Sequence, residues 1–300
     1  MIKRTLYFGN PCYLKKQNDQ LLIEPREGES KTVPIEDIGI VVLDNQQITL
    51  TTALLMALMD NNAAVLTNNW QHLPEGLLLP MTEHHAFTEK VRSQMEASEP
   101  LRKNLWQQTV QAKISNQAAL LKAIGADTDN MLYWADSVKS GDPDNYEARA
   151  AAYYWKSLFV DNELFKRGRY EAPPNNLLNY GYAILRGTIA RNLVASGMMT
   201  FRGIHHKNKY NPYCLADDIM EPYRPYVDKV VLDILSEDLE IEELTPDLKR
   251  RLLSIPATDI DIDGQSSPLM VGSQRTTASL MQCFEGVVRK IVYPTLKILE

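Results

Sequence analysis

The sequence predicts an α+β protein in which a small N-terminal β-sandwich domain precedes a larger all-α domain. The first 80 residues contain short apolar runs between turn residues, as strands do, and the chain beyond Pro80 has apolar residues at helical spacing. A chain of 300 residues is also long enough for two cores. We therefore expect a β domain at residues 1–82 and a helical domain at residues 83–300.

The β domain is expected to consist of hairpins. Turn chemistry at Asn18-Asp19, Gly28 and Asn61-Asn62 separates its apolar runs, and Thr51 or Thr52 can cap one helix with the sequence ALLMALMD. The predicted strands are Thr5–Phe8, Leu21–Glu24, Ile38–Leu43 and Ala63–Leu66.

The helical domain is expected to follow a linker, MTEHH, at residues 81–85. Pro100 is suited to the first position of a helix that runs to about Ile124 and ends at Gly125. Residues 255–275, with two prolines and two glycines, predict a mobile loop. Further helices are predicted at residues 130–140, 144–158, 175–196, 216–234 and 276–298.

The composition, 44% hydrophobic and 23% charged, is that of a folded globular chain. No apolar run approaches the roughly 18 residues of a membrane span, and the start MIKRTLYFGN lacks the apolar core of a signal peptide. These features predict a cytoplasmic protein with no membrane association. The three scattered cysteines predict neither a disulfide framework nor a zinc cluster; they are Cys12, Cys214 and Cys283.

The charges are unevenly distributed. A net charge of −6 argues against a nucleic-acid partner, but residues 156–210 hold nine Lys or Arg against three Asp or Glu. Residues 235–263 reverse that balance, with nine acids against three bases. The basic block predicts a face that binds phosphates, with a merely solvated face as the alternative.

Two segments of the helical part combine residues that could carry chemistry. Asp144 and Glu147 have the spacing of a helix capping box, which is the structural alternative to a functional role for Glu147. Gly203 breaks the preceding helix, so that His205 and His206 fall on a connecting segment. Neighbouring histidines without a cysteine frame do not by themselves define a metal site.

A third segment, LADDIMEPYRP, concentrates acids. In a helix, Asp217, Asp218 and Glu221 fall on one face, which is unfavourable unless a cation lies among them. Acids that complement the helix dipole are the alternative. Pro222 should kink or end the helix and so fix the direction of Glu221.

Four segments, in this order along the chain, resemble the successive motifs of the CRISPR-associated spacer integrases, the Cas-one family. The likeness is closest to the family's short form, which accompanies effector systems with a single large nuclease. It spans nearly the whole chain, because a β domain followed by a helical catalytic domain is also the family's architecture. The segments are EARAAAYYW at 147–155, NNLLNYGYAILRG at 175–187, GIHHKNKYN at 203–211 and LADDIMEPYRPYVD at 215–228.

The resemblance implies one divalent metal ion, Mg²⁺ or Mn²⁺, held by three catalytic residues. The glutamate of the family's E-x-R-x-x-x-x-x-[WF] motif falls on Glu147, and the closing acid of its D-h-h-[DE] motif (h is hydrophobic) falls on Glu221. The histidine of its G-h-h-H motif falls on His206, while His205 stands where the family often has an apolar residue. Asp218, the first acid of the closing pair, and His205 are expected to support the site. Carboxylates with one imidazole suit such an ion.

The resemblance also implies the reaction: the 3′-hydroxyl ends of foreign DNA, the protospacers, are joined to a CRISPR repeat by transesterification, and water as nucleophile gives hydrolysis. The implied partners are double-stranded DNA, a second copy of the chain, the small Cas-two subunit and the large effector nuclease. The candidate DNA contacts are Arg167, Arg169, Arg186, Arg191, Lys207 and Lys209.

Two other functions compete with this one. A non-catalytic scaffold would bind DNA through the same basic face while the acids only cap helices. A zinc hydrolase is disfavoured, because only one of the three expected ligands is a donor that zinc prefers.

Overall fold

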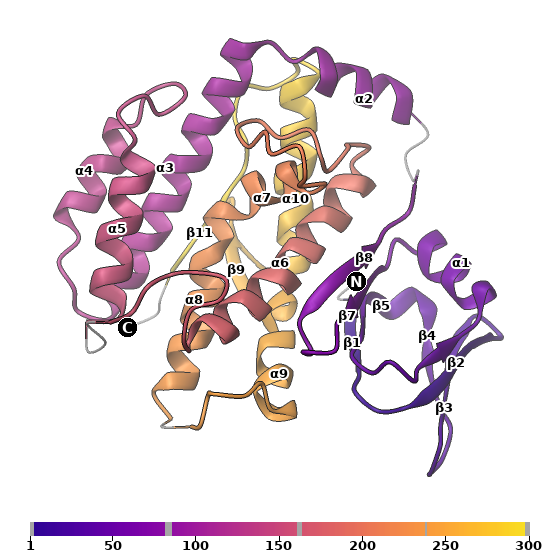
Figure 1. Ribbon diagram of the computed structural model, residues 1–300. Helices are drawn as coiled ribbons and strands as arrows, with labels where there is room; N and C mark the ends of the chain where they lie inside the picture. Colours follow the sequence, from indigo (N-terminus) through magenta and orange to yellow (C-terminus); the bar gives the residue numbers. More distant parts are fainter. Residues whose placement is uncertain (1–2, 82–85, 161–163, 238, 298–300) are drawn as a thin grey trace.

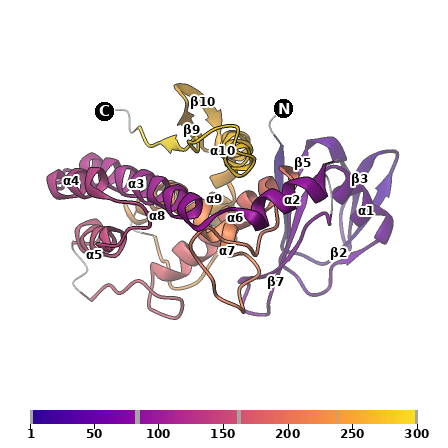
Figure 2. The same ribbon diagram turned by 90° about the horizontal axis from the view of Figure 1, so that it is seen from above.

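The computed structural model describes residues 3–81, 86–160, 164–237 and 239–297, and it has a β-rich part followed by a mainly helical part (Figure 1). The β-rich part, drawn in indigo, lies against one side of the helical part in two perpendicular views (Figure 2). The expected α+β class is confirmed. The expected linker lies, apart from Met81, outside the described residues, so the boundary near residue 82 stays a prediction.

Two four-stranded sheets form the β-rich part. In the first, of order β1-β5-β7-β8, the pairs β1–β5 and β5–β7 are parallel and β8 is antiparallel to β7. In the second, β4, β3 and β2 are antiparallel neighbours and β6 joins β2 in parallel. The strands are β1 (Arg4–Phe8), β2 (Cys12–Gln17), β3 (Gln20–Pro25), β4 (Lys31–Pro34), β5 (Ile38–Leu43), β6 (Thr49–Leu50), β7 (Ala64–Asn68) and β8 (Pro74–Leu78).

The two sheets share one apolar core with α1 (Thr52–Asp60). Thr51 caps this helix, as expected, and its hydroxyl accepts a hydrogen bond from the backbone N–H of Leu54 at 3.3 Å. The four predicted strands are present, but the expectation of hairpins is wrong for β1, β5 and β7, which pair in parallel. Parallel neighbours need crossover connections, and here the second sheet and α1 lie within those connections.

Nine α-helices lie in the described residues of the helical part. Pro100 is in the first turn of α3, and Gly125 follows that helix with a φ of 79°, as the sequence predicted. Two helices, α2 and α9, were not predicted. No helix within the described ranges has the length and apolar character that crossing a membrane requires. The helices are α2 (Phe87–Glu96), α3 (Glu99–Ala123), α4 (Asp129–Ser137), α5 (Tyr146–Leu158), α6 (Asn175–Ala195), α7 (Cys214–Met220), α8 (Arg224–Leu235), α9 (Pro246–Leu253) and α10 (Leu269–Phe284).

The C-terminal region corrects the sequence prediction. The mobile loop expected at residues 255–275 is instead a hairpin of β9 (Asp259–Ile262) and β10 (Gln265–Pro268), followed directly by α10. β11 (Pro294–Thr295) completes a three-stranded sheet, so the helical part is not all-α, and the helix expected at 276–298 is wrong in both bounds. Asp263 and Gly264 have φ values of 54° and 72°, as a tight hairpin turn requires.

The helical part is organised around α6, which is buried along most of its length. Its core is continuous with one face of the first sheet, because Ile40, Val42 and Leu66 belong to the same apolar cluster as the helices. A buried ion pair lies beside this contact: Asp44, directly after β5, accepts from Lys249 Nζ of α9 at 2.7 Å. The β-rich part therefore packs against the helices through both apolar and ionic contacts.

One buried carboxylate links three helices of this core. The hydroxyls of Tyr154 in α5 and Tyr182 in α6 donate hydrogen bonds to Asp228 of α8, at 2.7 and 2.5 Å. Burial raises the pKa of Asp228 to about 6, although the two hydrogen bonds and the charges of Arg224 and Arg167 act in the opposite direction.

This pKa predicts a specific pH dependence of stability. Because the pKa is higher in the folded chain than in the unfolded chain, the folded chain holds this proton more tightly. The free energy of unfolding should therefore fall as the pH rises from about 4 to about 6, by up to about 3 kcal/mol, and then level off. Asp228→Asn should remove this pH dependence of the unfolding free energy, as measured by urea denaturation over the same pH range. Asp233→Asn, at an exposed position of α8, is the control. Identical pH curves for D228N and the native chain would contradict the assignment.

Candidate functional site

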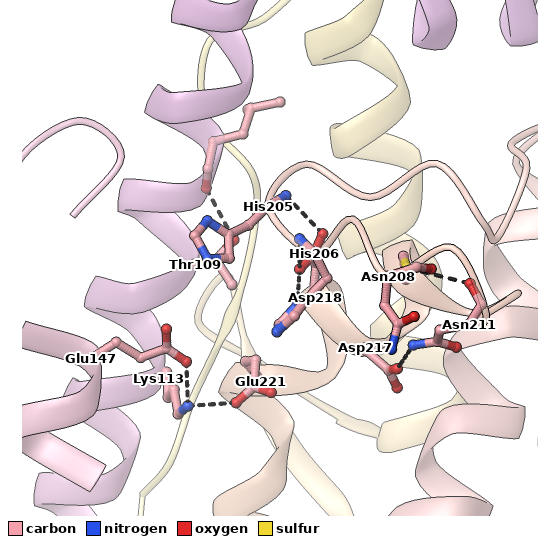
Figure 3. A network of polar contacts seen from close by, with 12 residues as sticks. Thr109, Lys113, Glu147, His205, His206, Asn208, Asn211, Asp217, Asp218 and Glu221 are labelled. Atoms are coloured by element: carbon pink, nitrogen blue, oxygen red, sulfur yellow. Dashed lines mark hydrogen bonds and ion pairs between the residues drawn. The ribbon is translucent and has the colours of Figure 1, made fainter. Parts of the chain in front are cut away.

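A buried lysine lies between two acids at the centre of the helical part (Figure 3). Lys113 of α3 places its Nζ 2.7 Å from Oε1 of Glu147, in the first turn of α5, and 2.7 Å from Oε2 of Glu221. The side chains of Lys113 and Glu221 are only 9% and 7% exposed. Segments far apart in the sequence thus meet at one ammonium group.

Glu147 is directed to this point by the way α5 begins. Asp142 caps the helix: its two carboxylate oxygens accept hydrogen bonds from the backbone N–H groups of Tyr146 and Glu147, each at 2.9 Å. The capping box expected between Asp144 and Glu147 is therefore wrong. The side chain of Glu147 contacts Lys113 instead of turning back to the helix start.

Glu221 is the first residue of a short 3-10 turn, η2 (Glu221–Tyr223), because Pro222 ends α7 as expected. Asn116 of α3 donates to the carbonyl oxygen of Pro222 at 2.8 Å and ties this turn to the helix that carries Lys113. Oε1 of Glu221 accepts from Arg224 Nε at 2.9 Å. Burial alone raises the pKa of Glu221, but the charges of Arg224 and Lys113 outweigh it and hold the pKa at about 2.

The segment after Gly203 folds around Asp218 of α7. This fully buried carboxylate accepts from the backbone N–H groups of His205 and His206, at 3.0 and 3.2 Å, and from Nδ1 of His206 at 2.5 Å. The hydrogen bond to Asp218 raises the pKa of His206 and outweighs the effect of burial. A carboxylate partner on Nδ1 leaves Nε2 as the nitrogen that a neutral His206 can offer to a ligand.

The neighbouring histidine has a different environment. His205 lies flat on the buried indole of Trp106 in α3, with ring centroids 4.1 Å apart and an angle of 8° between the planes. Burial lowers the pKa of His205, while the charge of Asp218 opposes that effect. Asp218 and Trp106 therefore fix the two imidazoles in different orientations.

The three acids of α7 and η2 do not share one partner. Asp217 accepts from Arg186 Nε and from Asn211 Nδ2, each at 2.6 Å. Asp218 holds the histidine segment, and Glu221 faces Lys113 (Figure 3). The expected accumulation of negative charge on one face is therefore relieved by three separate sets of donors.

The expected metal ligands Glu147, His206 and Glu221 lie near one another, but an ammonium occupies the point where the two glutamates meet (Figure 3). Across the part of the chain that the structure describes, no three His, Cys, Asp or Glu side chains converge closely enough to hold a metal. The donor chemistry nevertheless suits a hard divalent ion. Oε2 of Glu221 is buried, and Lys113 is the cation that contacts it, at 2.7 Å. In the chemistry of their donor atoms, these residues therefore fit a divalent cation.

Comparison with known proteins gives the family of the chain. A family model described as CRISPR associated protein Cas1 matches residues 6–254. The chain belongs to the Cas1 family. It is 38% identical over 281 residues to a CRISPR-associated endonuclease Cas1 of Neisseria meningitidis serogroup C, across 93% of this chain and 91% of the relative. The family resemblance is confirmed, and the chain is a Cas1 endonuclease; the association with single-nuclease effector systems stays a prediction.

Solved structures show the same Cas1 fold. A Cas1 protein from Thermotoga maritima matches with a TM-score of 0.78 and 15% identity, over 94% of this chain and 97% of its own. A casposase bound to its integration product matches with a TM-score of 0.80 and 18% identity, over 100% and 96% of the two chains. A chain of a Cas6-RT-Cas1–Cas2 complex matches with a TM-score of 0.79 and 19% identity, over 99% of this chain and 37% of its own.

The basic residues expected to contact DNA differ in exposure. Arg191 is excluded in this conformation: it is 1% exposed and donates to the carbonyl oxygen of Asn62 and the side chain of Asn192. Its position on the buried face of α6 explains the error. Arg167 and Arg186 are partly buried in internal contacts, Arg167 with Asn175 and Asn179 and Arg186 with Asp217. The exposed members are Arg169, Lys207 and Lys209.

Sequence reasoning missed Lys113, although a signal existed. Lys113 follows Val110 by three residues and precedes Ile114 and Gln117 by one and four, which are all buried positions of α3. A lysine on the apolar face of a helix requires a partner. Burial lowers the pKa of Lys113, but the charges of Glu221 and Glu147 outweigh it and raise the pKa above its ordinary value.

Gly203 generates a prediction for this Cas1 site. A Cβ there would lie 2.5 Å from the carbonyl oxygen of His206 and 2.7 Å from Oδ2 of Asp218, so even alanine does not fit. Gly203→Ala should displace the histidine segment, lower the unfolding free energy by about 1–3 kcal/mol and reduce DNA cleavage by about tenfold or more. Denaturation and a nicking assay measure both effects.

Gly125→Ala is the matched control for this variant. Gly125 has a positive φ and open space around it, remote from the histidines, so the substitution strains the backbone elsewhere. Gly125→Ala should lower the unfolding free energy while leaving DNA cleavage close to the native rate. Full cleavage activity of G203A would disprove the steric role of Gly203.

Proposed function

We propose that this Cas1 endonuclease joins 3′-hydroxyl ends of foreign DNA to a CRISPR repeat, with Glu147, His206 and Glu221 as ligands of one Mg²⁺ or Mn²⁺ ion. The observation that carries the proposal is the position of Glu147 and Glu221 around one cation, with His206 held beside them by Asp218. The family model supports it, because its match over residues 6–254 includes all three residues.

The chemistry follows from these positions. The 3′-oxygen of the incoming strand attacks a repeat phosphorus; a new P–O bond forms, and the old bond breaks as the repeat's own 3′-oxygen leaves with a proton. A bound divalent ion would polarise the phosphate and neutralise the charge that develops there. Asp218 orients His206 through Nδ1, and Arg224 holds Oε1 of Glu221, so that Oε2 would be the oxygen that binds the ion. With water as nucleophile the same arrangement hydrolyses DNA.

The proposed assembly contains double-stranded DNA, a second copy of the chain and Cas2, with the large effector nuclease joining during selection of spacers. Residues 1–82 would act as the dimerisation domain and residues 83–300 as the catalytic, DNA-binding domain. Solved structures of relatives bound to an integration product and in a complex with Cas2 support the DNA and Cas2 parts of this assembly.

Removal of single ligands tests the metal site. Glu147→Ala, His206→Ala and Glu221→Ala should each reduce strand joining by about 100-fold or more, because each removes one donor to the ion. Duplex binding should stay near native, since phosphate contacts of Lys and Arg need no metal. His205→Ala should reduce strand joining less, because the His205 ring stacks on Trp106 and is not one of the three proposed ligands. The readout is integration of a labelled duplex into a repeat-bearing plasmid, with and without Cas2.

The same experiment separates enzyme from scaffold. A scaffold would bind DNA equally well in chelator and would never nick or join strands. If H205A were inactive and H206A active, the ligand would be His205. If all four variants joined DNA at the native rate, the catalytic proposal would be wrong.

The exposed basic residues after the histidines test the DNA face. Lys207→Glu with Lys209→Glu should weaken duplex binding by about tenfold or more and flatten the dependence on salt, because each lost phosphate contact lowers the logarithmic slope by about 0.9. Fluorescence anisotropy over a salt series measures both quantities. Lys122→Glu, exposed near the end of α3, is the control. An unchanged affinity and slope would place the DNA elsewhere.

A further inference from the structure

The position of Lys113 raises a question of charge. Its Nζ is 2.7 Å from an oxygen of each glutamate, and divalent ions bind carboxylate oxygens at about 2.0–2.6 Å. An ammonium and a metal ion therefore cannot both occupy the space between Glu147 and Glu221. Either the metal does not bind these oxygens, or Lys113 leaves them when the metal arrives.

The two cations that contact Glu221 differ in how firmly they are held. Arg224 bonds Oε1 and lies over the ring of Tyr182, with its Cζ 4.5 Å from the ring centroid. Lys113 contacts the other oxygen, Oε2, and shares its ammonium with Glu147. An ammonium on a flexible four-carbon chain moves more easily than a stacked guanidinium. Lys113 is thus the exchangeable partner and Arg224 the fixed one.

We infer that Lys113 is the resident counter-ion of the metal site: its ammonium holds Glu147 and Glu221 in place without metal, and a divalent ion binds by displacing it. The inference rests on the proposed metal site. The ammonium prevents the two carboxylates from repelling each other in a region where water screens them poorly. The same contact competes with the metal, so Lys113 lowers metal affinity while it stabilises the metal-free fold.

Metal binding to the complete chain without DNA tests the exchange. K113M and K113Q remove the competing charge and should bind Mn²⁺ at least about tenfold more tightly than the native chain in isothermal titration calorimetry. K113R keeps a cation and should show no gain. In chelator, K113M should have a lower Tm than the native chain, and Mn²⁺ should raise the Tm of K113M by more.

Matched controls keep the outcomes distinct. K103M removes a lysine on an exposed part of the same helix and should leave Mn²⁺ affinity unchanged. Glu221→Gln should weaken Mn²⁺ binding in both the native and the K113Q chain. If it weakens neither, the proposed metal site is wrong, and the exchange fails with it. If binding depends on Glu221 but K113M and K113Q bind no more tightly than the native chain, the exchange alone is wrong.

A measurement on the native chain avoids any folding defect of the variants. The ¹⁵N resonance of the Lys113 ammonium, identified by its absence from K113R, should change on titration with Mg²⁺. A resonance that stays unchanged at saturating Mg²⁺ would show that the ammonium keeps its two carboxylate partners and would overturn the inference.

Discussion

The ionised carboxylate of Glu221 sets the constraint on which the centre of the helical part depends. A buried carboxylate without partners would take up a proton or unfold its surroundings, so cations must approach both of its oxygens. Arg224 and Lys113 do so from different elements, and α3 must therefore pass close to η2. Asn116, one turn along α3, hydrogen bonds to the same 3-10 turn. The site is thus held by the packing of α3 as much as by its own residues.

A second buried carboxylate performs a different task. Asp218 uses its oxygens on two backbone N–H groups and one imidazole, so it fixes the shape of the histidine segment. Acids three residues apart in sequence, Asp218 and Glu221, thereby have separate partners: Asp218 orients His206, and Glu221 pairs with Lys113 and Arg224.

Local signals explain what the sequence predicted well. Thr51, Pro100, Gly125 and Pro222 act within one turn of the chain, and each begins or ends its helix as expected, although α3 starts one residue before Pro100. The grouping of Glu147 with His206 and Glu221 came from four ordered motifs, not from spacing. The Asp263-Gly264 pair, preceded by alternating isoleucines, is also a local signal, and it indicates a hairpin turn. The prolines and glycines of the same segment led instead to the prediction of a loop.

The unpredicted features depend on contacts between distant parts of the chain. Lys113 acquires its partners only because α5 and η2 pack beside α3, and the parallel pairing of β1, β5 and β7 depends on crossover connections. The expectation that Arg191 contacts DNA fails for the same reason, because its charge alone does not show that this face of α6 is buried. A charged residue can be read from sequence, whereas its surroundings cannot.

The ion pair between Asp44 and Lys249 has a mechanical consequence. Both side chains are buried, and leaving either charge in that environment without its partner costs about 3–5 kcal/mol. The first sheet and α9 therefore resist hinge motion against each other, and the shared apolar cluster adds to this stiffness. A partner bound to the outer strands of the first sheet would consequently be held in a fixed orientation relative to α9.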